Sequence, residues 1–188
     1  IKHCPECNSE LIRDEGEAQH YCPNRDGCPP QIKGKMIHFI GRKQMNIDGI
    51  GSETIDLLYS EGLVKNIADL YELKKTDILP LERMAEKSAD NIIKGIEESK
   101  KIPFHKLLFA LGIRYVGETV AKKLVTHYMS MDALLKTNQE ELESVDEIGD
   151  KIAVSVLEFI QNENNIILIN RLKEYGLNME VSRKVLEQ

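Results

Sequence analysis

All four cysteines of this 188-residue chain lie within its first 28 residues. They form two close pairs, Cys4-x2-Cys7 and Cys22-x5-Cys28, with fourteen residues between the pairs. Each pair can chelate a metal from a tight turn, and the intervening loop lets the two pairs converge, an arrangement that suits tetrahedral zinc. Because four thiolates leave no coordination position for water or substrate, the spacing predicts a structural zinc site.

Two disulfides, or four free thiols, are alternative interpretations of these cysteines. The rest of the chain lacks cysteine and shows no secretory signal, which favours a reducing cytoplasm and therefore zinc. His3 and His20 flank the cluster and could replace a thiol, although four thiols already complete the shell. Residues 11–13 and 19–21 are expected to pair as short strands around the acidic turn 14–17. A finger of about 30 residues cannot fold without its metal, because it buries too little apolar surface.

Catalytic groupings are not evident in the sequence. The segment Asn46-Ile47-Asp48-Gly49 is similar to the Lys-x-Asp-Gly motif of nucleotidyltransferases, but asparagine replaces the nucleophilic lysine. Without an amine nucleophile, no covalent nucleotide adduct can form there. A Gly-rich phosphate loop, paired metal carboxylates and a Ser/His/Asp arrangement are also missing from the sequence, so no catalytic residue is expected.

A repeated pattern follows the cysteines. Four stretches share a small central residue, with apolar residues four and one positions before it and seven and eight positions after it. The centres are Gly51, Ala85, Gly117 and Gly149, at spacings of 34, 32 and 32 residues. Self-similarity at a fixed period indicates one supersecondary unit used repeatedly, and the pattern predicts helix, tight hairpin, helix.

The turn Gly49-Ile50-Gly51 indicates what such a hairpin does. Two glycines around one buried apolar residue let the backbone turn sharply, and they leave no side chain between the amide groups and a ligand. The next helix presents unpaired N–H groups and its positive dipole end in the same direction, which makes a phosphate site without base readout. We therefore expect sequence-independent contact with a DNA backbone. The alternative is that glycine only closes a tight turn between helices.

The four copies differ in the slot of the first glycine, which holds Gly49, Arg83, Tyr115 and Glu147. Arg83 could supply charge to a phosphate, Tyr115 could stack or pack, and Glu147 would repel a phosphate. The first and third hairpins are therefore expected to bind best, with Lys122 or Lys123 as additional contacts in the third. The lysines of the set could equally be solvated surface residues. The predicted DNA-binding residues are Gly49, Gly51, Lys87, Arg114, Gly117, Thr119, Gly149 and Lys151.

Composition sets further limits. The net charge is −6, with an isoelectric point of about 5.5, which argues against indiscriminate binding to nucleic acid but leaves room for a local basic face. Aromatic residues make up only 5% of the chain and tryptophan is absent, so the core must be aliphatic. No apolar run approaches the roughly 18 residues that a membrane span needs. A cytoplasmic protein without a membrane partner is expected.

Helical periodicity predicts a mainly α fold after the finger. Residues 31–42 carry a broad apolar stripe and are expected to form a connecting helix, in which His38 is packed and uncharged. Pro103, Ser130, Ser88 and a capping box at Thr137 mark helix starts. The further helices are expected near 52–61, 66–72, 88–100, 103–111, 118–128, 131–136, 138–144, 150–162 and 164–175.

The predicted domains follow from these elements. The Cys4 finger takes residues 1–30 and the connecting helix 31–45. A helix-hairpin-helix domain takes 46–180, in two paired units of about 46–110 and 111–180. Residues 181–188 are expected to be a tail or linker.

The order of a four-cysteine finger followed by four hairpins resembles the C-terminal half of bacterial NAD-dependent DNA ligases over nearly all of residues 1–180. The segments that carry the resemblance are Cys22-Pro23-Asn24, Asp48-Gly49-Ile50-Gly51, Ala68-Asp69-Leu70-Tyr71, Glu86-Lys87-Ser88-Ala89, Ala110-Leu111-Gly112-Ile113-Arg114 and Val116-Gly117-Glu118-Thr119.

The resemblance implies a longer protein. It would hold an adenylation domain, which receives AMP from NAD on a lysine, and an OB-type domain before this segment, with a BRCT-type domain after it. The hairpins would grip nicked duplex DNA through its backbone, while the zinc finger braces the OB and hairpin domains. The implied role is nick sealing in replication and repair, in a bacterial cytoplasm at the nucleoid. This fragment would neither bind NAD nor seal nicks alone. One alternative is a non-catalytic repair scaffold. The other is a protein-interaction module, and the acidic net charge favours this second alternative.

Overall fold

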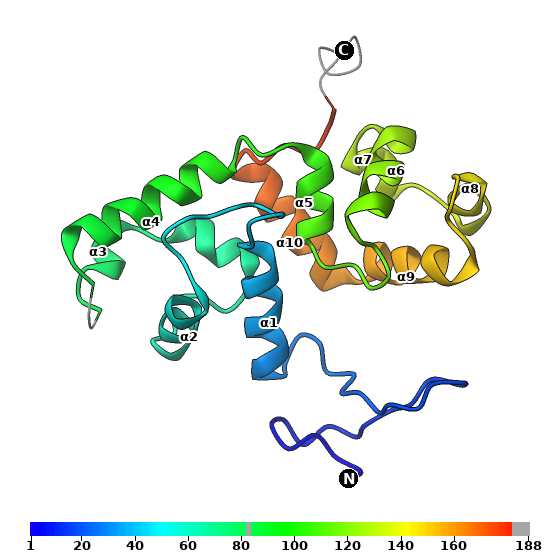
Figure 1. Cartoon of the computed structure of the whole chain (residues 1–188), viewed down its shortest axis with the longest axis horizontal. Coiled ribbons are helices and arrows are strands. Elements are labelled where there is room, and N and C mark those ends of the chain that lie inside the picture. Colours follow the sequence, from blue (N-terminus) through cyan, green and yellow to red (C-terminus); the bar gives the residue numbers. More distant parts are fainter. Residues whose placement is uncertain (82–83, 182–188) are drawn as a thin grey trace.

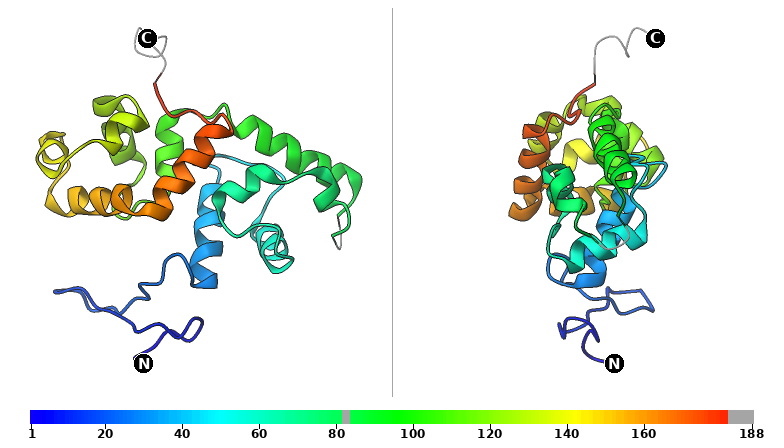
Figure 2. Two further views of the ribbon diagram at one scale, coloured as in Figure 1. Left: turned by 180° about the vertical axis from the view of Figure 1, so that it is seen from behind. Right: turned by 90° about the vertical axis from the view of Figure 1, so that its left-hand side faces the viewer.

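A computed structural model describes residues 1–81 and 84–181 of the chain. Arg83, which the sequence suggested as a phosphate contact, and most of the expected tail lie outside these residues. The described part confirms a mainly α protein with a cysteine-rich finger at its N-terminus (Figure 1). Both views in Figure 2 show the finger at one end of the molecule, joined to the helical body through α1 (Pro29–Phe39).

Helix α1 begins directly after the last cysteine. Cys28 is its N-cap, and prolines occupy the first two helical positions, where their missing N–H groups cost no hydrogen bond. Met36 and Phe39 are fully buried, so the predicted connecting helix packs into the body. His38 lies between an amide and a carbonyl: its Nδ1 is 3.1 Å from Gln44 Nε2, and its Nε2 is 3.0 Å from Phe109 O. Both ring nitrogens therefore have hydrogen-bond partners, and the ring is packed as the sequence predicted.

The first pair of hairpins follows α1. It contains α2 (Ser52–Ser60), the 3-10 helix η1 (Ile67–Glu72), α3 (Lys75–Ile78) and α4 (Glu86–Ser99). The first hairpin turn joins α1 to α2, and the second joins α3 to α4. The short helix α3 was missed in the sequence, since four residues are too few to show a helical period.

The second pair contains α5 (Phe104–Ala110), α6 (Glu118–Tyr128), α7 (Met131–Leu135), α8 (Gln139–Ser144), α9 (Asp150–Gln161) and α10 (Glu163–Glu174). The third hairpin turn joins α5 to α6, and the fourth joins α8 to α9. The connecting helix, predicted over 31–42 and given residues 31–45 as a segment, ends at Phe39. Every other predicted helix has a counterpart whose ends differ by no more than two residues, within the usual uncertainty of helix boundaries.

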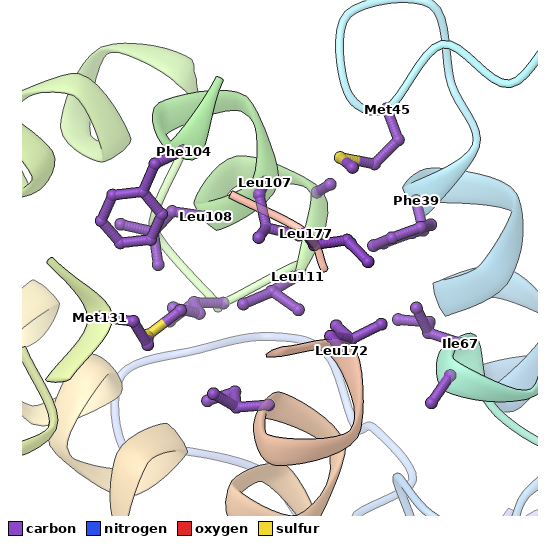
Figure 3. Close-up of a cluster of buried hydrophobic side chains, with 14 of the residues drawn as sticks. Phe39, Met45, Ile67, Phe104, Leu107, Leu108, Leu111, Met131, Leu172 and Leu177 are labelled. Atoms are coloured by element: carbon purple, nitrogen blue, oxygen red, sulfur yellow. The ribbon is translucent and has the colours of Figure 1, made fainter. Parts of the chain in front are cut away.

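One aliphatic core holds both pairs together. Figure 3 shows Leu107, Leu108 and Leu111 of the α5 region packed between α1 and η1 on one side and Met131 on the other. Leu172 and Leu177 close this cluster from α10 and the segment after it.

Helix α10 ties the second pair to the first. Arg171 Nη2 lies 2.9 Å from both Asp69 Oδ1 and Glu72 Oε1 of η1. After α10 the chain runs beside residues 129–131, where the N–H of Val181 donates to Met129 O at 2.8 Å.

Three local predictions were wrong in detail. Ser88 does not start a helix, because α4 begins at Glu86 with Ala85 as its N-cap. Asn138, not Thr137, caps α8, because its side-chain oxygen accepts from the N–H of Glu141. Thr137 instead hydrogen bonds with the hydroxyl of Tyr128. In the finger, pairing between the expected strands is limited to an isolated bridge between Ile12 and Tyr21.

Candidate metal centre and nucleic-acid interface

The fold brings all four cysteines together. Their sulfur atoms lie within 4.8 Å of one another, and none forms a disulfide. Cys4 Sγ is 3.9 Å from Cys28 Sγ, and Cys7 Sγ is 3.5 Å from Cys22 Sγ. A tetrahedral zinc ion with Zn–S bonds of about 2.3 Å separates its sulfurs by about 3.8 Å, so the four thiols fit structural zinc.

Tight turns present each pair of thiols. The N–H of Asn8 donates to Cys4 O at 2.9 Å, and Asn8 takes a left-handed φ of 62° that asparagine tolerates. The N–H of Cys28 donates to Asn24 O at 3.0 Å, which closes the second turn. Both turns thus present sulfurs that converge in one cluster.

The thiols differ in acidity. Hydrogen bonds from Ser9 lower the pKa of Cys7 to about 6, whereas burial raises the pKa of Cys28 to about 12. Burial also raises the pKa of Cys22. A metal ion must bind thiolates, so it displaces protons from Cys22 and Cys28 as it binds.

Three described hairpin turns share one backbone shape. The first-glycine slot takes a left-handed φ in each of them: 91° at Gly49, 69° at Tyr115 and 68° at Glu147. The apolar residue that follows is buried in every case, with exposures of 6% at Ile50, 5% at Val116 and 4% at Ile148. The third and fourth hairpins are therefore complete in shape although they lack the first glycine.

The second-glycine slot has a different property. Gly51, Gly117 and Gly149 are the N-caps of α2, α6 and α9, with φ of −111°, −84° and −92°. All three are exposed, and a Cβ atom added at any of them would meet no atom within 4 Å. Ala85, the N-cap of α4, has the same extended conformation with a φ of −84°. Neither backbone strain nor packing therefore requires glycine at these three positions.

The helices after these turns also lack a side-chain cap. In α2, α6 and α9 no side chain accepts from the first-turn N–H groups. By contrast, Asn or Ser side chains cap η1, α7, α8 and α10, which do not follow a hairpin turn. The helices α1 and α5 do not follow one either and also lack a side-chain cap. The hairpin helices thus keep exposed N–H donors at their positive dipole ends, where an anion can bind.

Gly49 and Gly95 have packing roles. A Cβ on Gly49 would lie 3.4 Å from the α4 backbone at Asn91 and Ile92, and one on Gly95 would lie 2.6 Å from Asp48 O. The packing role of Gly95 was missed in the sequence because this residue lies inside a regular helix. A glycine within a helical pattern is itself an indication that another backbone approaches closely there. These glycines seat the first hairpin turn on α4.

The third and fourth hairpins brace each other. Lys123 of α6 lies 3.1 Å from Asp146 Oδ2 and 3.9 Å from Glu147 Oε1. The hydroxyl of Ser155 on α9 donates to Arg114 O. Glu147, expected to repel a phosphate, thus has a cation nearby. A groove of about 640 Å³ lies between α6 and the fourth turn. It is lined by Thr119, Lys122, Lys123, Thr126, His127, Ser144, Val145 and Asp146.

The predicted cationic contacts have different surroundings. Lys87 is exposed at the second position of α4, and Thr119 is exposed at the second position of α6. Arg114 and Lys151 instead contact the finger: Arg114 Nη1 is 3.3 Å from Asp14 Oδ2, and Lys151 Nζ is 3.5 Å from Glu17 Oε1. Sequence spacing gave no indication of this contact.

The described helices are each too short or too polar to cross a lipid bilayer.

Three family models match separate parts of the chain. Residues 3–29 match the NAD-dependent DNA ligase C4 zinc finger domain. Residues 42–98 match a SAM-like helix-hairpin-helix tandem, and residues 106–169 match a helix-hairpin-helix motif. The matched segments correspond to the cysteine cluster, the first pair of hairpins and the second pair.

Curated relatives named DNA ligase match nearly the whole chain. The protein of Flavobacterium johnsoniae is 60% identical over 185 residues, that of Christiangramia forsetii 60% over 184, and that of Phocaeicola vulgatus 58% over 184. These matches cover 98% of this chain, which spans only 28% of the length of each relative. The chain therefore belongs to the NAD-dependent DNA ligase family, as its zinc-finger and helix-hairpin-helix portion.

Proposed function

We propose that this chain is the part of an NAD-dependent DNA ligase that grips nicked duplex DNA through backbone phosphates. The observation that carries the proposal is the set of exposed glycine N-caps at Gly51, Gly117 and Gly149. The fold does not require glycine there, whereas a phosphate approaching the first-turn N–H groups does require the absence of a side chain.

The remaining candidate residues would support this contact. Lys87 and Lys151 lie at the second helical position after their turns, and Thr119 follows Gly117 by two residues. Side chains at these positions can reach a phosphate held at the same N-terminus. Contacts of this kind set the position of the duplex and carry no base information.

The proposed contribution to nick sealing is positional. In the intact protein a separate adenylation domain would use NAD, and the hairpins would hold the broken strand so that its 5′-phosphate and 3′-hydroxyl meet that domain. This fragment would not seal nicks alone, since the nucleophilic lysine would lie in that separate domain. OB-type and BRCT-type domains of the same chain would be its partners, in a bacterial cytoplasm at the nucleoid.

Structural zinc would hold the finger in shape through Cys4, Cys7, Cys22 and Cys28. The ion would fix the turns that carry the sulfurs, because the finger lacks a hydrophobic core. Its tetrahedral shell would be complete, so it would supply no reaction chemistry.

The proposal is tested by binding of the zinc-loaded chain to a fluorescently labelled duplex with one nick, measured by anisotropy between 50 and 300 mM KCl. Contacts to several phosphates predict that the logarithm of the binding constant falls linearly with the logarithm of salt concentration. An intact duplex of the same sequence and a duplex of scrambled sequence serve as controls. Equal affinity for the scrambled nicked duplex is expected.

Absence of binding at 50 mM KCl, or affinity that does not depend on salt, would contradict the proposal. Either result would instead favour a protein-interaction module built on the same hairpins.

A further inference from the structure

The acidic turn of the finger, residues 14–17, lies against the third and fourth hairpins. Asp14 and Glu17 each contact Arg114, with distances of 3.3 Å from Nη1 to Asp14 Oδ2 and 3.6 Å from Nη2 to Glu17 Oε2. Glu17 Oε1 is also 3.5 Å from Lys151 Nζ and 3.5 Å from the hydroxyl of Tyr115. We call Arg114, Tyr115 and Lys151 the hairpin cationic cluster.

The hairpin cationic cluster is arranged around one aromatic ring. Lys151 Nζ lies 4.4 Å from the centroid of the Tyr115 ring, and the guanidinium carbon of Arg114 lies 4.9 Å from it. Arg114 is also 5.1 Å from the ring of Tyr21 in the finger. The two cations are thus held side by side at the turns of neighbouring hairpins, where the proposed function requires phosphate contacts.

The carboxylates of Asp14 and Glu17 at the hairpin cationic cluster resemble the phosphate groups that the proposed function would place there. Carboxylate and phosphate oxygens both accept charge-assisted hydrogen bonds from guanidinium and ammonium groups with similar geometry. The contact is half open to water, since the side chain of Arg114 is 34% exposed and that of Lys151 is 66% exposed. Ion pairs with this exposure are individually weak, so a polyanion can replace the carboxylates.

The rest of the finger is attached elsewhere. Asp26 lies 3.4 Å from Lys35 Nζ of α1 and accepts from the side-chain amide of Asn164 on α10 at 3.1 Å. The acidic turn itself is exposed at Glu15 and Gly16, and Gly16 has a φ of 84°. In the described residues, the polar contacts of the acidic turn with the helical body are those of Asp14 and Glu17, whereas Asp26 attaches the finger separately, so replacing the two carboxylates opens the cluster without detaching the finger.

We propose that the acidic turn is an intramolecular competitor of DNA: Asp14 and Glu17 occupy the hairpin cationic cluster in the free protein, and a phosphate backbone must displace them to bind there. This inference rests on the proposed function and adds its regulation. Such a competitor would discriminate against weak, isolated anions and favour a ligand that engages several hairpins at once.

The test compares three zinc-loaded proteins in the same anisotropy assay with nicked duplex. The variant Asp14→Asn/Glu17→Gln removes both competing carboxylates. The control Glu10→Gln/Glu15→Gln removes two charges from the same finger, and neither of these side chains forms an ion pair within residues 1–81 and 84–181. Both variants have the same net charge, so they differ in the contact with the hairpins and at the Tyr21 hydroxyl, whose hydrogen bond to Asp14 Oδ1 the asparagine amide oxygen can still accept. One zinc per chain confirms that each finger is folded.

We expect the Asp14→Asn/Glu17→Gln variant to bind about three- to tenfold more tightly than the wild type, and the control to change by less than about twofold. Equal gains in both variants would show a general charge effect and overturn the inference. Unchanged or weaker binding by the Asp14→Asn/Glu17→Gln variant would also overturn it, because the carboxylates would then be neutral or would position Arg114. Failure of all three proteins to bind at 50 mM KCl would contradict the proposed function itself.

Discussion

At the scale of single residues, two glycines of the hairpin pattern have opposite roles. Gly49 takes a φ of 91° and lies against the α4 backbone, so its glycine serves the fold. Gly117 has an ordinary φ of −84° and empty space where a Cβ would lie, so its glycine serves a ligand. Bulky replacements should therefore weaken DNA binding more than they disturb the helices at Gly117, but not at Gly49.

We predict that Gly117→Ala leaves the free energy of unfolding within about 0.5 kcal/mol of the wild type, because Ala85 already adopts this conformation. DNA affinity should fall about three- to tenfold, since the added methyl group lies between the phosphate and the first-turn N–H groups. Gly49→Ala should lower the free energy of unfolding by about 1 to 2 kcal/mol, because alanine is strained at a left-handed φ. Urea unfolding measures the free energy of unfolding, and fluorescence anisotropy measures the affinity for nicked duplex.

The pair of glycine variants separates the ligand role from the turn role. If Gly117→Ala loses stability as Gly49→Ala does, or binds nicked duplex like the wild type, then glycine at the helix N-cap has no function toward DNA.

At the scale of elements, the junction between η1 and α4 depends on one buried polar contact. The hydroxyl of Tyr71 is 2.8 Å from Ser99 Oγ, and Ser99 in turn donates to Ile96 O at 2.6 Å. The hydroxyl of Tyr71 therefore donates its hydrogen bond to Ser99 Oγ. Tyr71 is buried, and its ring stacks on Tyr175 with centroids 6.0 Å apart. The hydrogen bond joins η1 to α4 within the first pair, and the stacking of Tyr71 on Tyr175 holds that pair against the C-terminal region.

Ser99→Ala should lower the free energy of unfolding by about 1 to 2 kcal/mol, because it leaves the buried Tyr71 hydroxyl without an acceptor. Tyr71→Phe added to Ser99→Ala should recover part of the loss, since no polar group then remains unsatisfied. Thermal and urea unfolding of the single and double variants form the double-mutant cycle. Additive losses in the double variant would show that the two hydroxyls do not act as a pair.

At the scale of the whole molecule, the finger and the helical body are held by different forces. The body has a continuous aliphatic core from Met36 to Met179. In the described finger, residues 1–28, the buried side chains are only those of Cys4 and Cys28. Stability of the finger must therefore come from its metal and from its contacts with α1, α10 and the hairpins.

We predict that a chelator unfolds the finger and leaves the helical body intact. The far-UV circular dichroism should change little, while the amide chemical shifts of residues 1–28 in nuclear magnetic resonance spectra move to the values of an unfolded chain. Simultaneous loss of the helical signal would show that the body cannot fold without the finger.

Zinc affinity should also depend on pH. Burial raises the pKa of Cys28 to about 12, so this thiol is protonated in the metal-free finger at neutral pH and must release its proton to bind. Acidification opposes that release, and competition with a chelator should show weaker zinc binding at pH 6 than at pH 8. Equal affinity at the two pH values would contradict thiolate ligation.

Several features could be predicted because they depend on neighbouring residues in the sequence. Ser130 caps α7 as expected, since a cap needs only its own side chain and the N–H of Ala133. Helix α6 has the bounds that its apolar period indicates. Thr137 shows the limit: it competes with Asn138 for the same cap, and a contact with Tyr128 from another helix decides the outcome.

The sequence by itself determined the cysteine cluster, the three repeated turns that the structure describes and the helical class, because ligand spacing and apolar period are local patterns that do not depend on how the helices are arranged. Only the tertiary structure decided which glycines have no neighbouring atoms where a Cβ would lie, and that Gly95 leaves room for the backbone of the first hairpin turn at Asp48. It also decided that Arg114 and Lys151 contact the finger. Those facts depend on contacts between residues that are far apart in the sequence, and local sequence patterns do not indicate such contacts.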